Sequence, residues 1–274
     1  MAQKNHITVV KLGGTEGVDF SAICQDAASL IQQGQKLVLV HGGSSEANQL
    51  GETVGHPPRF VTSPSGYTSR YTDRQTLEVF AMAVNGKVNT FLVEQLQRLG
   101  INALGLSGLD GRLMVAKRKS SVRIIENGKQ KILRDDYTGK IEDVNGLLLG
   151  TLLTGGYLPV IAPIAASMEG EALNVDADRA AAMIAGSLNA DNLILLTAVP
   201  GLMRSFPDES TLIRKISGSQ IEGALEAAEG RMKKKVLGSQ EALQNGVGKV
   251  IIADGRVENP ISDALGGSGT IFSK

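Results

Sequence analysis

A lysine closes an apolar run near the start of the chain, where a core position would not favour a charge. The run is "VVKLGG", in which Lys11 stands just before Gly13 and Gly14. One interpretation is that the side chain reaches solvent along its apolar stem. Glycine, however, lets backbone N–H groups approach an anion, and an ammonium group beside them would bind it. We therefore predict that Lys11 faces a phosphate group.

A second cationic group lies in "GRMKKKV", within a helical pattern over residues 230–245. Lys233, Lys234 and Lys235 follow one another there. Three consecutive helical residues span about 200° of the helix surface, so a single solvated face cannot hold all three. We expect one lysine to point toward whatever lies at the start of this helix.

Polar residues alternate in "NVDAD", at the start of a helical pattern over residues 177–188. They are Asn174, Asp176 and Asp178. Asp and Asn routinely cap helices, but capping accounts for only one of the three. The other two are available to a crevice at the start of the helix.

A hydroxyl-rich stretch, "SGYTSRYTDRQ", carries Arg70 and Arg74 and runs directly into an apolar helical pattern. The planar fork of arginine matches a carboxylate with two parallel hydrogen bonds. This stretch therefore predicts a carboxylate-binding loop at a helix entrance.

These residues need a scaffold, and the apolar pattern predicts one. Short apolar runs alternate with helical patterns, which favours a parallel sheet covered by helices on both faces. We predict strands at 7–12, 36–40, 102–106, 157–163, 192–196 and 249–253. We predict helices at 19–33, 44–54, 73–99, 145–154, 177–188 and 230–245.

Glycines follow several of the predicted strands. They are Gly13, Gly14, Gly42, Gly43, Gly105, Gly108 and Gly201. Tight turns alone would explain one such pair. The carboxyl ends of parallel strands share one edge of a sheet, however, and ligands bind there, so we favour phosphate binding at this edge. Neither G-x-x-x-x-G-K-[ST] nor a helix-opening G-x-G-x-x-G is present.

Residues 112–144 interrupt the alternation. Asn127-Gly128 lies between two extended runs, which predicts a β-hairpin. From Arg112 to Arg134 there are eight Lys or Arg residues and one acid, Glu126. A solvated hairpin is the simpler interpretation, but so concentrated a charge would steer an acidic partner. The predicted fold class is therefore α/β: a three-layer αβα sandwich around a mostly parallel sheet, with a protruding β-hairpin.

Composition excludes several classes of protein. Lys+Arg and Asp+Glu both number 28, so the whole chain has no charge bias toward nucleic acid or an anionic membrane. Cys24 is the single cysteine and is expected in the core, and the histidines have no zinc-site spacing. We expect no metal site made by the chain itself. The start of the chain lacks the apolar core of a signal peptide, and we expect a cytoplasmic protein without a membrane span.

Six segments in order resemble the amino acid kinase family, acetylglutamate kinase branch. They are "VVKLGG", "VLVHGG", "NVDAD", "LLTAVPGL", "GRMKKKV" and "GGSGTIF". The resemblance implies transfer of the γ-phosphoryl group of ATP, bound with Mg²⁺, to a carboxylate. It also implies one kinase domain over residues 1–274, with an acceptor lobe at 1–185 and an ATP lobe at 186–274, and a homodimer formed through the 73–99 helix.

The resemblance also implies roles for individual residues. Lys11 would stabilise the transferring phosphoryl group from the acceptor side and Lys235 from the leaving-group side, with Asp178 between the two ammonium groups. Gly42, Gly43, Arg70 and Asn174 would bind the acceptor, with Arg74 supporting Arg70. Gly13, Gly14 and Gly201 would bind the nucleotide.

Other segments resemble a narrower group, the kinases that act on 2-aminoadipate attached to an amino-group carrier protein in lysine biosynthesis. They include "GHPPRFVTSPSGYTSRYTDRQTLEVF", "GLSGLDGRL" and "ADGRVENPI". The resemblance implies an acidic carrier protein as partner, and we expect Lys117, Arg118, Lys119 and Arg123 to dock it. Three alternatives stay open: an N-acetylglutamate kinase, a carrier kinase that also accepts glutamate, and a non-catalytic amino-acid or nucleotide sensor on the same fold. Ala198 stands where acetylglutamate kinases have Asp, which weakens the first of them.

Overall fold

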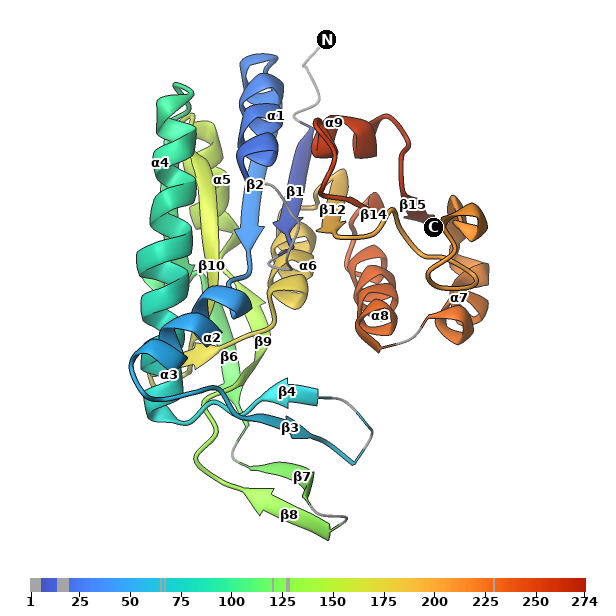
Figure 1. The fold of residues 1–274 in the computed structure, drawn as a ribbon. Helices are drawn as coiled ribbons and strands as arrows, with labels where there is room; N and C mark the ends of the chain where they lie inside the picture. Colours follow the sequence, from blue (N-terminus) through green and yellow to red (C-terminus); the bar gives the residue numbers. More distant parts are fainter. Residues whose placement is uncertain are drawn as a thin grey trace.

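A computed structural model describes residues 6–13, 20–64, 66, 68–119, 121–126, 129–228 and 230–274. A long sheet runs through the molecule with helices on both faces, and a smaller sheet projects below it (Figure 1). The predicted α/β sandwich with a mostly parallel sheet is confirmed.

The main sheet has eleven strands, nine of them in the order β13-β15-β14-β12-β1-β2-β10-β6-β9, with β11 and β5 also paired to β10. Their bounds are β1 Ile7–Leu12, β2 Lys36–His41, β5 Ala103–Gly108, β6 Met114–Arg118, β9 Gly139–Val144, β10 Leu158–Ala166, β11 Ala172–Asn174, β12 Asn192–Thr197, β13 Lys215–Ser217, β14 Lys249–Asp254 and β15 Thr270–Ser273. The central strands β14, β12, β1, β2 and β10 are parallel, and β5 pairs with β10 in the same direction. All six strands predicted from the sequence are present.

Helices cover both faces of this sheet. The α-helices are α1 Phe20–Gln32, α2 Ser44–Thr53, α3 Arg74–Ala81, α4 Thr90–Arg98, α5 Gly146–Thr154, α6 Ala177–Ser187, α7 Ile221–Ala227, α8 Gly230–Gln244 and α9 Pro260–Leu265. Short 3₁₀ turns lie at η2 Asp110–Arg112, η3 Glu209–Thr211 and η4 Gly218–Gln220. None of the described helices is long and apolar enough to cross a membrane.

The continuous apolar strands are explained by two separate cores. Side chains alternate between the two faces of a strand, and in β2 Leu37 and Leu39 belong to a core with α1, α4 and α9. Val38 and Val40 belong to a second core with α5, α6 and α8. Because both faces of the strand are buried, no polar residue interrupts the run.

The predicted 73–99 helix is continuous but not uniform. A π-helical segment, η1 Met82–Asn89, joins α3 to α4. Such segments are rare and often lie at functional sites. The hydroxyl group of Thr90 donates to the Asn85 carbonyl at 3.2 Å, inside the widened turn.

The second sheet has the order β4-β3-β7-β8. Its strands are β3 Phe60–Thr62, β4 Thr68–Arg70, β7 Val122–Glu126 and β8 Lys129–Leu133, and it projects below the main sheet in Figure 1. The β7–β8 ribbon is the predicted hairpin, although its turn residues Asn127 and Gly128 lie outside the described residues. The interruption predicted over residues 112–144 is too long, however, because β6 and β9 lie within it and belong to the main sheet.

The proposed division into lobes at residue 185 stays a prediction. Strand β1 of the first lobe pairs directly with β12 of the second, so one sheet runs through both.

Candidate active site

One carboxylate bridges two ammonium groups at the carboxyl end of β1. The Lys11 Nζ atom lies 3.0 Å from Asp178 Oδ1. The Lys235 Nζ atom donates to Asp178 Oδ2 at 2.7 Å. The lysine side chains are only 10% and 12% exposed, so both charges are largely removed from water.

Three elements far apart in sequence bring this arrangement together. Lys11 comes from β1, Asp178 from the first turn of α6 and Lys235 from α8. Asp176 performs the capping role, because its carboxylate accepts from the Arg179 N–H at 3.0 Å, which leaves Asp178 free to bind the lysines. Lys233 and Lys234 are exposed, whereas Lys235 is largely buried and reaches the site.

The electrostatics keep the carboxylate ionised. Burial alone would raise the pKa of Asp178, but the ammonium groups of Lys11 and Lys235 hold it well below its ordinary value. Burial also lowers the pKa of Lys235, and the charge of Asp178 opposes that effect. The carboxylate therefore preserves the positive charge of a buried lysine.

The glycines predicted to bind anions fall into two groups. Gly13 and Gly43 are buried and Gly42 is half-buried, at the carboxyl ends of β1 and β2, while Gly14 lies outside the described residues. A side chain at Gly43 would lie 2.8 Å from Val84 Cγ1 on the π-helical segment.

The other three glycines, Gly105, Gly108 and Gly201, lie against packed neighbours, and the nucleotide contact of Gly201 stays a prediction. A Cβ atom at Gly105 would lie 2.1 Å from Asn89 Oδ1, and one at Gly108 would lie 2.5 Å from the Ile164 carbonyl. A Cβ atom at Gly201 would lie 2.6 Å from Thr270 Oγ1. Gly105 and Gly108 lie within β5 rather than after it, so their predicted phosphate contact gives way to close packing.

Arg70 ends β4 and is only 9% exposed. Its Nη2 atom donates to Asn48 Oδ1 at 2.7 Å and to the Ser44 carbonyl at 3.2 Å, which ties it to α2 beyond the Gly42-Gly43 turn. Its guanidinium group lies 5.2 Å from the ring centroid of Phe60 and 5.9 Å from that of Phe80. Stacking and burial thus fix the plane of the group.

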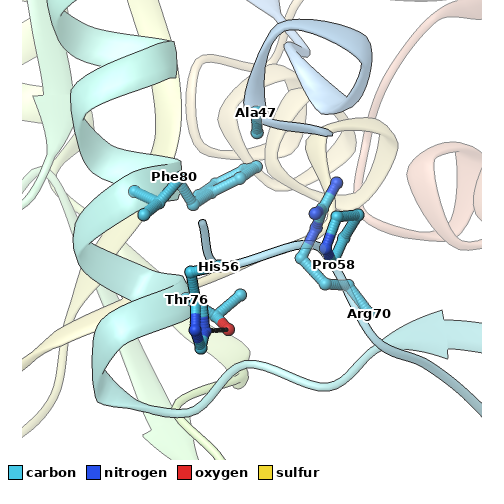
Figure 2. Close-up of a pocket in the computed structure, with 7 residues that line it drawn as sticks. Ala47, His56, Pro58, Arg70, Thr76 and Phe80 are labelled. Atoms are coloured by element: carbon cyan, nitrogen blue, oxygen red, sulfur yellow. Dashed lines mark hydrogen bonds between the residues drawn. The ribbon is translucent and has the colours of Figure 1, made fainter. Parts of the chain in front are cut away.

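Figure 2 shows Arg70 and Phe80 beside a small cavity that is also lined by His56 and Thr76. His56 Nε2 lies 2.9 Å from Thr76 Oγ1, which the dashed line marks. The side chains of His56 and Thr76 therefore hydrogen-bond to each other at the cavity wall, next to the buried Arg70.

Asn174 and Arg74 have separate positions. The Asn174 side chain donates to Thr72 Oγ1 at 3.0 Å, two residues after Arg70, and so lies near the same loop. Arg74 begins α3 and donates to Glu78 at 2.9 Å on its own helix. The expected support of Arg70 by Arg74 stays a prediction.

The four basic residues expected to dock the carrier protein differ in exposure and in their contacts within the chain. Lys117, Lys119 and Arg123 are exposed. Arg118 lies over the Tyr137 ring at 3.6 Å and donates to the Asp136 carbonyl at 2.9 Å. Glu171 and Asp135 are ion-pair partners of Arg118 at 3.3 and 3.5 Å, so its charge is already engaged within the chain.

Sequence reasoning missed a cavity of about 300 Å³ near the carboxyl ends of β12 and β14. Its lining includes Pro200, Arg214, Asp254 and Ser268, from separate loops. The segment "GGSGTIF" was a usable signal, because it brings the chain back to this edge.

Known proteins resemble this chain over most of its length. Residues 6–254 match the amino acid kinase family. The chain belongs to the amino acid kinase family. It is 59% identical to the LysW-aminoadipate kinase of Deinococcus radiodurans, over 98% of this chain and 92% of that protein. It is 54% identical to the LysW-aminoadipate kinase of Thermus thermophilus, over 96% and 98% of the two chains.

Solved structures share the fold of this kinase family member. The N-acetylglutamate synthase of Neisseria gonorrhoeae, complexed with coenzyme A and N-acetyl-glutamate, has a TM-score of 0.80 at 25% identity, over 98% of this chain and 60% of that one. The carbamate kinase of Giardia lamblia bound to AMP-PNP has a TM-score of 0.69 at 16% identity, over 99% of both chains, and shows the fold alone. Membership of the family and the kinase relatives make this chain an ATP-dependent kinase that acts on a carboxylate.

Proposed function

We propose that the chain transfers the γ-phosphoryl group of ATP to the side-chain carboxylate of 2-aminoadipate attached to an amino-group carrier protein. The product is an acyl phosphate for reduction in cytoplasmic lysine biosynthesis. The observation that carries the chemistry is the pair of buried lysines held by Asp178. The relatives named LysW-aminoadipate kinase support the choice of acceptor.

The reaction needs cations rather than a general base. A carboxylate is already ionised near neutral pH, so the difficulty is the approach of two anions. Phosphoryl transfer is catalysed by positioning and by positive charge around the transferring group. In our proposal Lys11 stabilises that group from the acceptor side and Lys235 from the leaving-group side. Asp178 fixes the spacing of the two lysines.

The acceptor site in this proposal lies between β4 and the Gly42-Gly43 turn. The guanidinium group of Arg70 binds the acceptor's α-side carboxyl group, and Asn174 binds its amide. The stacking of Arg70 on Phe60 and Phe80 supports this role, because it orients the fork before the acceptor arrives.

The nucleotide site is proposed at the carboxyl ends of β1, β12 and β14. Gly13 and Gly14 donate backbone N–H groups to the phosphates, and the cavity lined by Pro200 and Asp254 takes the remainder of the nucleotide. Gly201 shapes this loop by its packing on Thr270. Mg²⁺ is bound through the nucleotide, since both oxygens of Asp178 already face ammonium groups.

The docking surface for an acidic carrier is proposed on the small sheet. Arg123 is exposed on β7, and Lys117 and Lys119 are exposed at and just after the end of β6 in the main sheet. Strand β7 pairs with β3, whose other neighbour β4 carries Arg70. One sheet therefore links the basic ribbon to the acceptor clamp. We leave Arg118 out of the docking set because Tyr137, Asp135 and Glu171 hold it.

Carrier-linked glutamate is a second candidate acceptor. The chain is 37% identical to a Sulfolobus acidocaldarius protein named LysW-aminoadipate/LysW-glutamate kinase, over 96% and 99% of the two chains. One methylene in a pocket is worth only about 1–3 kcal/mol, so both acceptors could be used.

We also propose a homodimer formed through the α3-η1-α4 helix. Met82 and Phe91 lie on this helix, and each is 54% exposed. Analytical ultracentrifugation tests it: sedimentation as a dimer is expected, and a monomer at micromolar concentration would contradict it.

The proposed activity is tested by ADP release with three acceptors. They are carrier-linked 2-aminoadipate, carrier-linked glutamate and free N-acetylglutamate. We expect the highest kcat/KM with carrier-linked 2-aminoadipate. A preference for the free acetylated amino acid would overturn the proposal.

A further inference from the structure

We propose that His41 and Asn89 are positioning residues that aim the Gly43 N–H toward the face of the sheet on which Lys11 lies. This inference rests on the proposed function, because it assigns a use to the Gly42-Gly43 turn in acceptor binding. Neither residue touches the reacting groups in this proposal. They act through the peptide bond between Gly42 and Gly43.

A chain of hydrogen bonds fixes this turn from inside the protein. His41 Nδ1 lies 2.7 Å from the Gly42 carbonyl oxygen, and His41 is fully buried. A carbonyl oxygen only accepts, so Nδ1 carries the proton and Nε2 does not. The Asn89 amide then donates to Nε2 at 3.0 Å and to the Val160 carbonyl at 2.9 Å.

The ring must be neutral for this chain to hold, because a protonated Nε2 could not accept from Asn89. Burial, with a smaller contribution from the nearby charge of Lys11, lowers the pKa of His41 to about 4. The ring is therefore neutral over the working range of a cytoplasmic enzyme.

The geometry of the peptide between Gly42 and Gly43 links the position of the Gly42 oxygen to the direction of the Gly43 N–H. A trans peptide directs its C=O and its N–H to opposite sides. His41 follows Leu37 and Leu39 at a period of two, so it lies on the α1 and α4 face with them. Lys11 follows Val9 in β1, on the opposite face with α6. Holding the Gly42 oxygen on the first face therefore turns the Gly43 N–H toward the second.

The π-helical segment explains why Asn89 can reach this position. Val84 Cγ1 and Val88 Cγ2 would lie 2.8 and 3.3 Å from a Cβ atom at Gly43, so the helix presses against the turn. Asn89 ends the same segment, and the absence of a side chain at Gly105 makes room for its amide. Three strands, β2, β5 and β10, thus surround one asparagine.

Two substitutions of His41 separate positioning from simple core stability. The amide nitrogen of Asn can take the place of Nδ1, whereas the amide of Gln reaches the place of Nε2. His41→Asn therefore keeps the donor to Gly42, and His41→Gln keeps the partner of Asn89. Both leave one contact of a buried network unmade, so both should lower Tm to a similar extent.

We expect His41→Asn to recover most of the wild-type kcat with carrier-linked 2-aminoadipate. His41→Gln should lose about 10²-fold, the typical cost of misplacing a reacting group by about 1 Å. ATP affinity, measured by calorimetry, should be alike in the two variants. Equal kcat losses that follow the losses in Tm would overturn the inference, and so would wild-type kcat in His41→Gln.

Crystal structures of the variants decide the question without any acceptor. The Gly42-Gly43 peptide should keep its orientation in His41→Asn and rotate in His41→Gln, and an unchanged peptide in both would overturn the inference. If the wild-type protein turns over no carrier-linked acceptor, the proposed function fails. The orientation of the Gly42-Gly43 peptide in the variants then tests the positioning role by itself.

Discussion

Replacing Asp178 by Asn should cripple catalysis by removing the charge that two lysines share. The substitution keeps the shape of the side chain. The Lys11 and Lys235 side chains are only 10% and 12% exposed in the wild-type structure. The substitution leaves their ammonium groups without an anionic partner. They would repel each other and lose their fixed spacing.

The magnitude follows from the distances. Charges separated by the 3.0 and 2.7 Å seen here attract by about 5–6 kcal/mol each at an effective dielectric constant near 20. Desolvation offsets much of that gain, and breaking a buried pair typically costs about 3–5 kcal/mol. We expect kcat to fall by about 10²–10³, as when one preorganised charge-stabilising group is removed.

The pH profile provides a more specific signature. Asp178 raises the pKa of Lys235 against the effect of burial. Without Asp178 that pKa falls further, so the charged form of Lys235 is lost at a lower pH. The alkaline limb of the kcat profile should therefore move to lower pH in Asp178→Asn.

The assay is ADP release from carrier-linked 2-aminoadipate across pH, with Tm measured in parallel. Asp176→Asn is the matched control, because Asp176 caps α6 two residues away and Asn caps equally well. It should stay close to wild type in kcat and Tm. A kcat for Asp178→Asn within about threefold of wild type, with an unmoved alkaline limb, would refute the reasoning.

Three further predictions concern individual cations. Lys235→Ala should lower kcat by about 10²–10³, whereas exposed Lys233→Ala should be mild, and equal losses would refute the choice of lysine. Arg70→Lys should weaken acceptor binding in calorimetry by about 10- to 100-fold through loss of charged hydrogen bonds, with ATP affinity nearly unchanged; an unaltered acceptor affinity would remove Arg70 from the site. Changing exposed Lys119 and Arg123 together to Gln should slow association with the carrier and flatten its salt dependence, because such charges act mainly on the association rate. A salt response like that of wild type would indicate a merely solvated ribbon.

The sequence predicted the central scaffold well because buried parallel strands leave a strong pattern. Strands such as β2 and β12 are nearly uninterrupted apolar runs, and both of their faces are covered. The short strands β3, β4, β11 and β13 have three residues each, which is too few to show a period. The π-helical segment was also hidden, because its apolar pattern continues that of the flanking helices.

The candidate site was only partly readable from the residues. The helical geometry of "KKK" predicted one inward lysine, but the roles of Lys11, Asp178 and Lys235 came from the family resemblance. Their meeting depends on a fold that joins β1, α6 and α8. Glycine at position 105 indicates a close approach, and the approaching group is the side chain of Asn89 rather than a phosphate.

The most direct test of the proposed activity is chemical trapping of its product. Carrier protein bearing 2-aminoadipate is incubated with the enzyme, MgATP and hydroxylamine, and the intact carrier is then examined by mass spectrometry. We predict a hydroxamate on the carrier-linked side chain, formed from the acyl phosphate, and its loss in Lys235→Ala. ADP release without any hydroxamate on the carrier would contradict the proposal, and so would a hydroxamate that forms only in a parallel incubation with free N-acetylglutamate.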